Sequence, residues 1–324
     1  MPQPNKQSIL TPISPPHHHK IPRNLNEIVQ LCSVRCLRDE SLGRQLDEIT
    51  ANESGSLDDF KCLFDDHLSK TDDFDATTRE YEYGSKLNTI VRQLGIAENF
   101  EWLINKIFHS KEAMINLVVN SYRHQNGFDK FVLMESPNGW KLRLHIWWSD
   151  SFISFQESIH DHSWMFASNV LAGRIYSDIF QEVEPEADQA ERFREHQYTS
   201  VSRSRENHSN QFQINYVKDT WLRATESSVM INAGQSYVFP QTMLHRILQP
   251  TFDEIHQNSN CGAVTLVLTA PRSRYTSRLI NTCNTDYEEE QTVIRMTEFE
   301  IRRKLQYVCQ YLKDRSDIPL KSPM

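Results

Sequence analysis

The chain of 324 residues carries a formal net charge of -8, and 38% of its residues are hydrophobic. This length allows a sizeable core, and the lack of a Lys/Arg stripe that could neutralise phosphates argues against a nucleic-acid partner. The sequence has neither an apolar run of about 18 residues nor an N-terminal apolar signal region, so we expect a cytoplasmic protein that makes no membrane contact.

The six cysteines are spread through the chain without a secretory signal, and we therefore expect free thiols. Cys32 and Cys36 have the i, i+4 spacing of one helix face. No second Cys or His pair accompanies them at zinc-finger spacing. These two thiols are therefore expected to be structural.

The first part of the chain divides into an arm and a helical region. Residues 1–23 are rich in Pro and His and are expected to be disordered, with three consecutive histidines too flexible to form a good metal site. Residues 24–121 show apolar stripes at helical spacing, for example Leu87, Ile90, Val91 and Leu94. Gly95 follows where that helix would end. We expect these helices to pack on a later sheet.

From residue 122 the hydrophobic period changes to that of β-strands. In the segment 140–148, Leu142, Leu144 and Ile146 share one face, while Arg143, His145 and Trp147 share the other, which faces either an interior site or solvent. Short strands without intervening helices indicate an antiparallel sandwich or barrel over residues 122–275. The strands are expected at 131–134, 140–148, 165–171, 173–180, 211–216, 229–232, 235–239, 245–248 and 263–268.

Two other segments are expected to lie outside this sheet. The polar stretch Glu182 to Asn210 is predicted to be a surface insertion or mobile loop, and it is a candidate lid. After Pro271 the strand pattern stops, so residues 276–324 are predicted to be a helical segment with a stripe at Ile301, Leu305 and Val308. This helix would pack on the sheet or on a second copy in a possible homodimer.

The main candidate for chemistry is the segment Ser158-Ile159-His160-Asp161-His162. Residues two apart on a strand project from the same face, so His160 and His162 would point together while Asp161 points away. If a later strand brings His245 alongside, three neutral imidazoles would bind one face of a metal and leave other positions open. This is the pattern of a catalytic rather than a structural metal site.

With these residues in place, the segment from about Tyr122 to Arg274 resembles the cupin superfamily, and within it the thiol dioxygenase group that includes cysteine dioxygenase. The residues 158–162, with Gly173 at the distance where the motif ends in a turn, look like the first metal motif. The residues 234–240 followed by His245 resemble the second motif, and 265–271 resembles the closing strand. The resemblance implies a mainly β fold, a double-stranded β-helix barrel with a helical N-terminal region and a C-terminal helix.

The sequence also departs from that group. The His and catalytic Tyr that cysteine dioxygenases carry on the closing strand correspond here to Val267 and Thr269, and the crosslinking Cys would fall near Ala167. No Glu ligand follows the second His between Ser163 and Asn169, which favours a three-histidine site. The resemblance implies that the family's carboxylate-binding Arg corresponds to Arg123. The resemblance therefore implies the metal centre but not the thiol substrate.

These observations lead to a hypothesis of a non-heme iron oxygenase that acts on a small polar or amino-acid-like substrate. Fe(II) would be the metal, with Zn, Ni and Cu as alternatives, and dioxygen the co-substrate. The alternatives are a zinc or nickel isomerase or hydrolase, and a non-enzymatic cupin that binds or senses a ligand. Arg143 and Tyr237 are the candidate catalytic residues, and the candidate substrate-binding residues are Arg123, His145, Arg174, Tyr176, Gln241 and Trp164.

Overall fold

The computed structural model describes residues 40–52, 54–69, 76–124, 126–149, 157–203, 209–248, 262–282, 290–292 and 294–314. The predicted arm at 1–23, Cys32 and Cys36 lie outside these ranges. Within them Cys62 and Cys309 are free thiols, as expected. None of the helices in the described ranges is long and apolar enough to cross a membrane.

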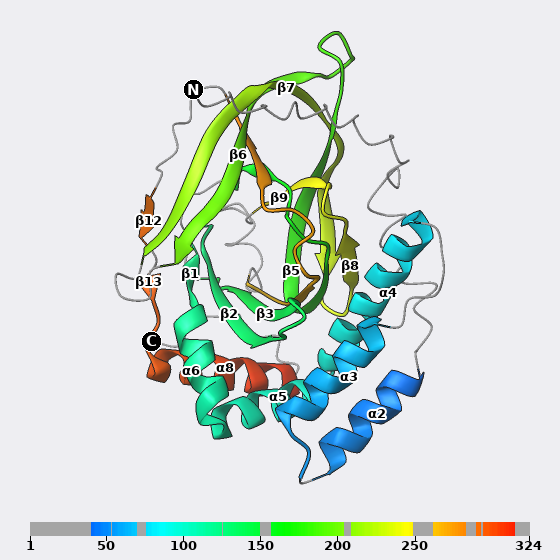
Figure 1. The fold of residues 1–324 in the computed structure, drawn as a ribbon, viewed down its shortest axis with the longest axis vertical. Coiled ribbons are helices and arrows are strands. Elements are labelled where there is room, and N and C mark those ends of the chain that lie inside the picture. Colours follow the sequence, from blue (N-terminus) through cyan, green and yellow to red (C-terminus); the bar gives the residue numbers. More distant parts are fainter. Residues whose placement is uncertain are drawn as a thin grey trace, which may run out of the picture.

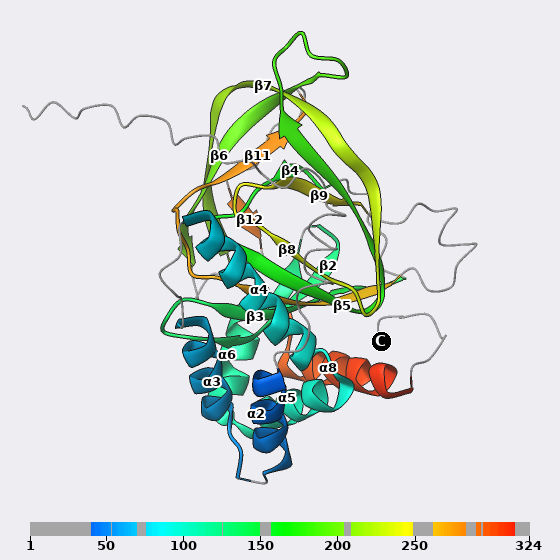
Figure 2. The ribbon, with the colours of Figure 1, turned by 90° about the vertical axis from the view of Figure 1, so that its right-hand side faces the viewer.

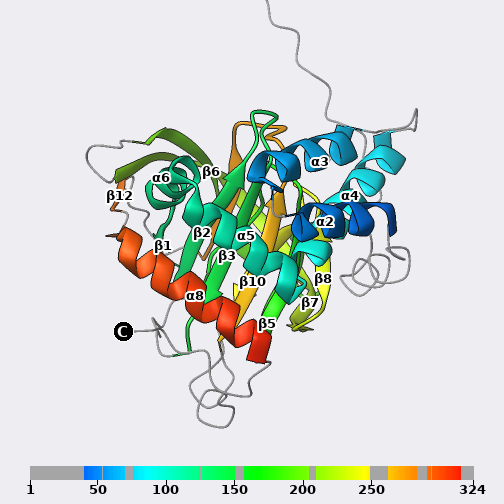
Figure 3. The ribbon, with the colours of Figure 1, turned by 90° about the horizontal axis from the view of Figure 1, so that it is seen from below.

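Helices form one side of the molecule (Figure 1; Figure 3). They are α2 (Glu40–Ala51), α3 (Leu57–Ser69), α4 (Ala76–Leu94), α5 (Ala97–His109), α6 (Lys111–Asn120) and the C-terminal α8 (Glu298–Asp314). Local sequence sets several starts. Thr297 and Glu300 exchange side-chain and backbone hydrogen bonds at the start of α8, and Ser56 and Asp59 do the same before α3. The prediction of helices before residue 121 is confirmed for the described part of that region.

The remainder of the described residues forms a mainly antiparallel β-structure of thirteen strands. The strands are β1 (Tyr122–His124), β2 (Phe128–Glu135), β3 (Lys141–Trp147), β4 (Ile159–His160), β5 (Phe166–Glu182), β6 (Glu191–Arg203), β7 (Ser209–Asn232), β8 (Ser236–Phe239), β9 (Leu244–Leu248), β10 (Ala263–Thr269), β11 (Ser277–Asn281), β12 (Glu290–Thr292) and β13 (Ile294–Arg295). A turn at 136–139 joins β2 to β3, with Gly139 at a φ of 95°.

The long strand β5 takes part in both halves of this β-structure. Before Gly173 it pairs with β8 and β10, and after Gly173 it pairs with β7 and β9. Gly173 has a φ of 67°, and a Cβ there would lie 1.7 Å from the carbonyl oxygen of Gly262. Only glycine tolerates this combination of backbone angle and close approach. The prediction of a turn at Gly173 is thus wrong, because the strand bends there and continues.

Two layers of strands enclose the region that carries the histidines. One layer contains β13, β1, β2, β3, β10, β5 and β8, and its outer face packs on the helices through Leu142, Leu144 and Ile146, all fully buried. Its opposite face, which we call the inner face, carries Arg143, His145 and Trp147 by strand alternation. A second apolar core with Phe166, Val267 and Phe239 fills the space against β9. The helices therefore cover the apolar face of β3 and leave its polar face toward the interior.

The second layer closes on itself. β5, β9, β4, β11, β6 and β7 form a circuit of antiparallel pairs, because β7 pairs with β6 on one side and β5 on the other (Figure 2). A small core inside the circuit contains Ile159, Phe193, Leu222, Leu244 and Ile280. Residues on β4 therefore alternate between two interiors. His160 faces the inner face of the first layer, whereas Ile159 faces the core of the circuit.

Two predictions about the sheet are wrong. The stretch Glu182 to Asn210 is not a loop insertion over its described residues, because it forms β6 and the start of β7. The sheet also continues after Pro271: β11 pairs with β4 and β6, and β12 and β13 pair with β7 and β1. Both segments are polar, so they lack the apolar alternation on which strand prediction rests. The two ends of the sheet path, β12 and β13, are close neighbours in sequence.

Candidate metal centre

Three histidines from two segments meet at the inner face. The antiparallel pairing of β4 with β9 sets His160 directly opposite His245, and His162 follows two residues later. Ring centroids lie 4.6 Å apart for His160 and His245, 4.8 Å for His160 and His162, and 5.1 Å for His162 and His245. One nitrogen from each ring lies within 4.8 Å of the others, so the group could hold a metal ion. The structure thus brings together the three residues that the sequence singled out.

Backbone carbonyl groups fix two of these rings. Nδ1 of His160 lies 2.9 Å from the carbonyl oxygen of Ser158, and Nδ1 of His245 lies 3.1 Å from that of Met243. A carbonyl oxygen only accepts, so each Nδ1 carries the proton, and Nε2 keeps its lone pair. This tautomer is the one that metal-binding histidines show when a carbonyl group orients them.

Burial disfavours the protonation of two of the three rings. It lowers the pKa of His162 and of His245 well below the usual value, and neighbouring His160 acts in the same direction on both. Arg143 and Lys130 lower the pKa of His162 further. Neutral imidazoles are the form that binds a metal ion, so the residues present fit a divalent cation of the iron, zinc, nickel or copper type.

Most of the candidate residues for catalysis or substrate binding lie near this group. Trp164 stacks on His162 with centroids 5.7 Å apart, and the guanidinium of buried Arg143 lies 4.8 Å from the Trp164 ring centre. Gln241 accepts a hydrogen bond from the backbone N–H of His162 through its carbonyl oxygen, at 3.3 Å. Tyr237 is buried behind Phe239, which contacts His245, and the Tyr237 and Phe239 ring centroids lie 4.8 Å apart. Burial raises the pKa of Tyr237 to about 12. Its phenol therefore stays protonated at neutral pH.

His145 occupies the inner face farther along the wall. Its ring lies 4.7 Å from Phe128 and 5.9 Å from Trp147. Its Nε2 is buried and makes no hydrogen bond within the described part of the chain. Burial, with Lys130 as the next cause, lowers the pKa of His145 well below its usual value. This neutral imidazole can therefore accept or donate one hydrogen bond to a ligand.

Three other candidates are directed elsewhere. Arg174 and Tyr176 lie on the face of β5 opposite Ile179, which pairs with His245, so their side chains point away from the histidines. The Arg174 guanidinium instead lies 3.8 Å from the sulfur of Met230. Arg123 alternates with the inward residues of β1 and forms an ion pair with Glu300 of α8, at 2.9 Å. The structure brings none of these three to the histidine cluster.

Sequence reasoning did not single out two polar residues of the inner face. His124 stacks between Tyr122 and Phe128, and burial lowers its pKa to about 3, with smaller contributions from Lys130 and His160. Lys130 pairs with His145 across β2 and β3, and its Nζ lies 3.1 Å from the hydroxyl oxygen of Tyr122. Strand alternation, with Phe128 and Lys130 on one face and Asp129 on the other, could have indicated the position of Lys130. The expected strand began only at residue 131, so this pattern was not used.

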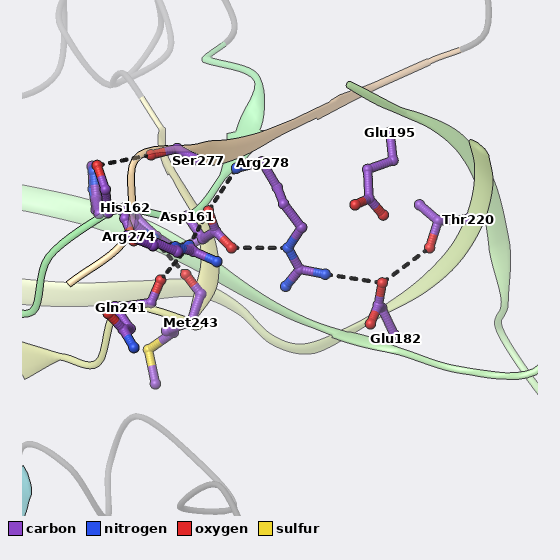
Figure 4. Close-up of polar contacts among 12 residues, drawn as sticks. Asp161, His162, Glu182, Glu195, Thr220, Gln241, Met243, Arg274, Ser277 and Arg278 are labelled. Carbon is purple, nitrogen blue, oxygen red and sulfur yellow. Dashed lines mark hydrogen bonds and ion pairs between the residues drawn. The ribbon is translucent and has the colours of Figure 1, made fainter. Parts of the chain in front are cut away.

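A second group that sequence reasoning missed is the pair of arginines that bind Asp161, on the side of β4 opposite the imidazoles. Asp161 is fully buried, and its carboxylate pairs with Arg274 and Arg278 at 2.5 and 2.8 Å (Figure 4). The guanidinium of Arg278 also pairs with the exposed Glu182 at the end of β5, at 3.0 Å. As predicted, Asp161 points away from the two imidazoles. Its arginine partners follow Pro271, where the sequence showed no periodic pattern.

Comparisons with known proteins add little to this geometry. No family model matches the chain, and no curated protein matches it. A solved structure of Streptomyces PAC13 with uridine is 11% identical, covers 56% of this chain and 92% of its own, and has a TM-score of 0.22. An HTH_3 family transcriptional regulator from Vibrio cholerae is 10% identical, covers 75% and 99%, and has a TM-score of 0.24. Likenesses this distant carry no argument about function.

Proposed function

We propose that the β-structure is a cupin-type double-stranded β-helix and that the chain is a non-heme iron oxygenase of the three-histidine type. The observation that carries the proposal is the convergence of His160, His162 and His245, with two of the three rings held by carbonyl groups so that Nε2 is free. Bound Fe(II) would supply the chemistry of dioxygen, which amino-acid side chains lack. The substrate would be a small polar or amino-acid-like molecule.

The protein groups around the histidines support this proposal by their placement. Arg143 is held over Trp164 next to His162, where a guanidinium suits a carboxylate or another anionic group of a substrate. His145 offers its buried Nε2 on the same face. Phe166 and Phe239 pack against His245 at 6.1 and 4.6 Å between ring centroids and would exclude water on that side. Tyr237 backs this apolar wall as a neutral phenol.

The test is to purify the protein anaerobically, measure its bound metals, and exchange His160, His162 and His245 singly for Ala. We expect about one iron per chain in the wild type and a strong loss in each variant. His109→Ala is the matched control, because His109 also has its Nδ1 on a carbonyl oxygen, that of Asn105, but lies on the exposed side of α5. Full iron retention by all three site variants would end the proposal.

Dioxygen uptake then separates the proposed activity from its alternatives. Pools of amino acids and related small acids serve as substrates. If the protein is an oxygenase, the metal-loaded form consumes dioxygen with these pools and the metal-free form does not. Turnover without dioxygen consumption would indicate the zinc or nickel isomerase or hydrolase. Ligand binding that is indifferent to the loss of metal would indicate a non-enzymatic binding module.

A further inference from the structure

The guanidinium of Arg274 lies where the two histidine-bearing segments meet. Its Nη2 is 2.8 Å from the carbonyl oxygen of His162, 2.9 Å from that of Gln241, and 2.5 Å from Oδ1 of Asp161. Nε adds a longer contact to the carbonyl oxygen of His162, at 3.3 Å. Asp161 and His162 belong to the first segment, whereas Gln241 lies in the turn between β8 and β9 that leads to His245.

The backbone alone joins these segments weakly. In the described residues, β4 pairs with β9 only at His160 and His245, and the N–H of His162 donates to Gln241 at 3.3 Å. Each segment is also irregular next to its histidines, since β4 ends at His160 and a turn precedes β9. The relative position of the imidazoles therefore depends on side-chain bonds in addition to the ladder.

Asp161 anchors the first segment to β11. Its Oδ1 accepts from the backbone N–H of Arg278 at 2.7 Å, and its Oδ2 accepts from Nε of the same residue at 2.8 Å. The N–H of Asp161 in turn donates to the carbonyl oxygen of Arg278 at 3.2 Å. Figure 4 shows Asp161 between the two guanidinium groups, with Arg278 reaching on to Glu182. One carboxylate is thus fixed at both oxygens.

The segment from Ser273 to Arg278 closes this arrangement. The backbone N–H of Ser273 donates to the carbonyl oxygen of Ser163 at 3.0 Å, and its hydroxyl group bonds to the side chain of Gln241. Arg274 is 29% exposed and Asp161 not at all, so the ion pair has a dry side toward β4 and a wet side toward solvent. This segment contacts both histidine-bearing segments and contributes no metal ligand itself.

We propose that Arg274, acting through Asp161 and two carbonyl groups, is a positioning residue that sets the spacing of the metal-binding imidazoles. This inference rests on the proposed metal site. A guanidinium presents five N–H groups in a fixed plane and can contact a carboxylate and two carbonyl oxygens together, whereas an ammonium is a point charge. The loss of such a partner behind a metal ligand typically weakens metal binding by about 10- to 100-fold.

The test measures metal affinity and metal-free stability separately. Arg274→Met removes all contacts, and Arg274→Lys keeps a charge for Asp161 but removes the planar fork. Arg302→Met is the matched control, because Arg302 also joins a carboxylate, Glu298, to a carbonyl oxygen of another element, that of Phe108, but between α8 and α5. Cobalt(II) serves as the probe. Competition with a chelator gives its dissociation constant, and its d–d absorption spectrum reports the geometry of the ligands.

We expect cobalt binding to be weaker by about 10- to 100-fold in Arg274→Met, with a smaller loss in Arg274→Lys. Both should show an altered cobalt spectrum, and any fall in the metal-free melting temperature should be too small to account for the loss of affinity. The Arg302→Met control should bind cobalt as the wild type does. If Arg274→Met does not fold, the Lys variant decides by the same criteria.

Three outcomes would overturn the inference. Equal affinity and an unchanged spectrum in the Arg274 variants would refute the positioning role and leave the metal site standing. A fall in metal-free melting temperature that accounts for the whole loss of affinity would show a merely structural role. Absence of cobalt binding by the wild type would refute the proposed metal site itself, and the positioning role with it.

Discussion

The ion pair between Lys304 of α8 and Asp129 of β2 gives the sharpest stability prediction. Both side chains are almost fully buried, at 6% and 5% exposure. Trp148 donates its indole N–H to the same carboxylate, and the Lys304 ammonium lies 5.5 Å from the Trp148 ring centre. The pair thus joins the C-terminal helix to the strand that carries Lys130 on its other face.

Lys304→Met keeps most of the side-chain volume but leaves the Asp129 carboxylate buried without a cation. Breaking a buried pair in this way costs about 3–5 kcal/mol, a large share of the roughly 5–15 kcal/mol that stabilises a domain. Asp129→Asn keeps an acceptor for Trp148, so the double variant should recover most of the loss.

Urea unfolding of the wild type, both single variants and the double variant forms the cycle that measures this coupling. We expect a coupling energy above about 2 kcal/mol. A loss below about 1 kcal/mol in Lys304→Met, or strictly additive effects, would refute the assignment of a strong buried pair.

Three further predictions concern the interior. Saturating metal, at 100 times its dissociation constant, should stabilise the wild type by about 2.7 kcal/mol, and His245→Ala should abolish this shift in thermal unfolding while His109→Ala keeps it. The pKa of His124 is near 6.5 in the unfolded chain but about 3 in the folded protein. The metal-free protein should therefore lose stability as the pH falls below 6.5, by about 2 kcal/mol from this residue at pH 5. A urea midpoint equal at pH 7 and pH 5 would contradict this. Gly173→Ala should destabilise far more than Gly234→Ala in urea unfolding, because both have positive φ but only at Gly173 does a Cβ meet backbone, at 1.7 Å, so similar losses would show that the bend tolerates a side chain.

The sequence predicted the orientation of side chains well in strands that bury apolar residues on one face only. On β3, Leu142, Leu144 and Ile146 meet the helices, and Arg143 and His145 face inward, as the period of two implied. The same period predicted that His160 and His162 point together, and the resemblance of residues 234–240 and His245 to the second metal motif singled out the third histidine. Periodicity could not say which face of β3 was interior. The helices that cover its apolar face decide that.

The polar strand β6 and the contacts of Arg274 were not predictable in this way. β6 carries charged and polar side chains on both faces, and one of them, Glu195, is buried with Lys218 3.7 Å away. Its sequence therefore looks like a loop. Arg274 follows a proline in a segment without secondary structure, and its role depends on contacts with residues far away in the chain. The bend at Gly173 also reverses which residues of β5 face inward, which placed Arg174 and Tyr176 on the opposite side.

The short strands β12 and β13 have a consequence for the solubility of the protein. They belong to one stretch of chain, Glu290 to Arg295, yet they cover β7 at one end of the sheet path and β1 at the other. An uncovered strand offers its N–H and C=O groups to any passing chain, and short capping strands suppress such pairing. Substitutions that release both short strands and leave α8 in place would expose two templates for intermolecular strand addition at once, so self-association should rise more than when either strand alone is released.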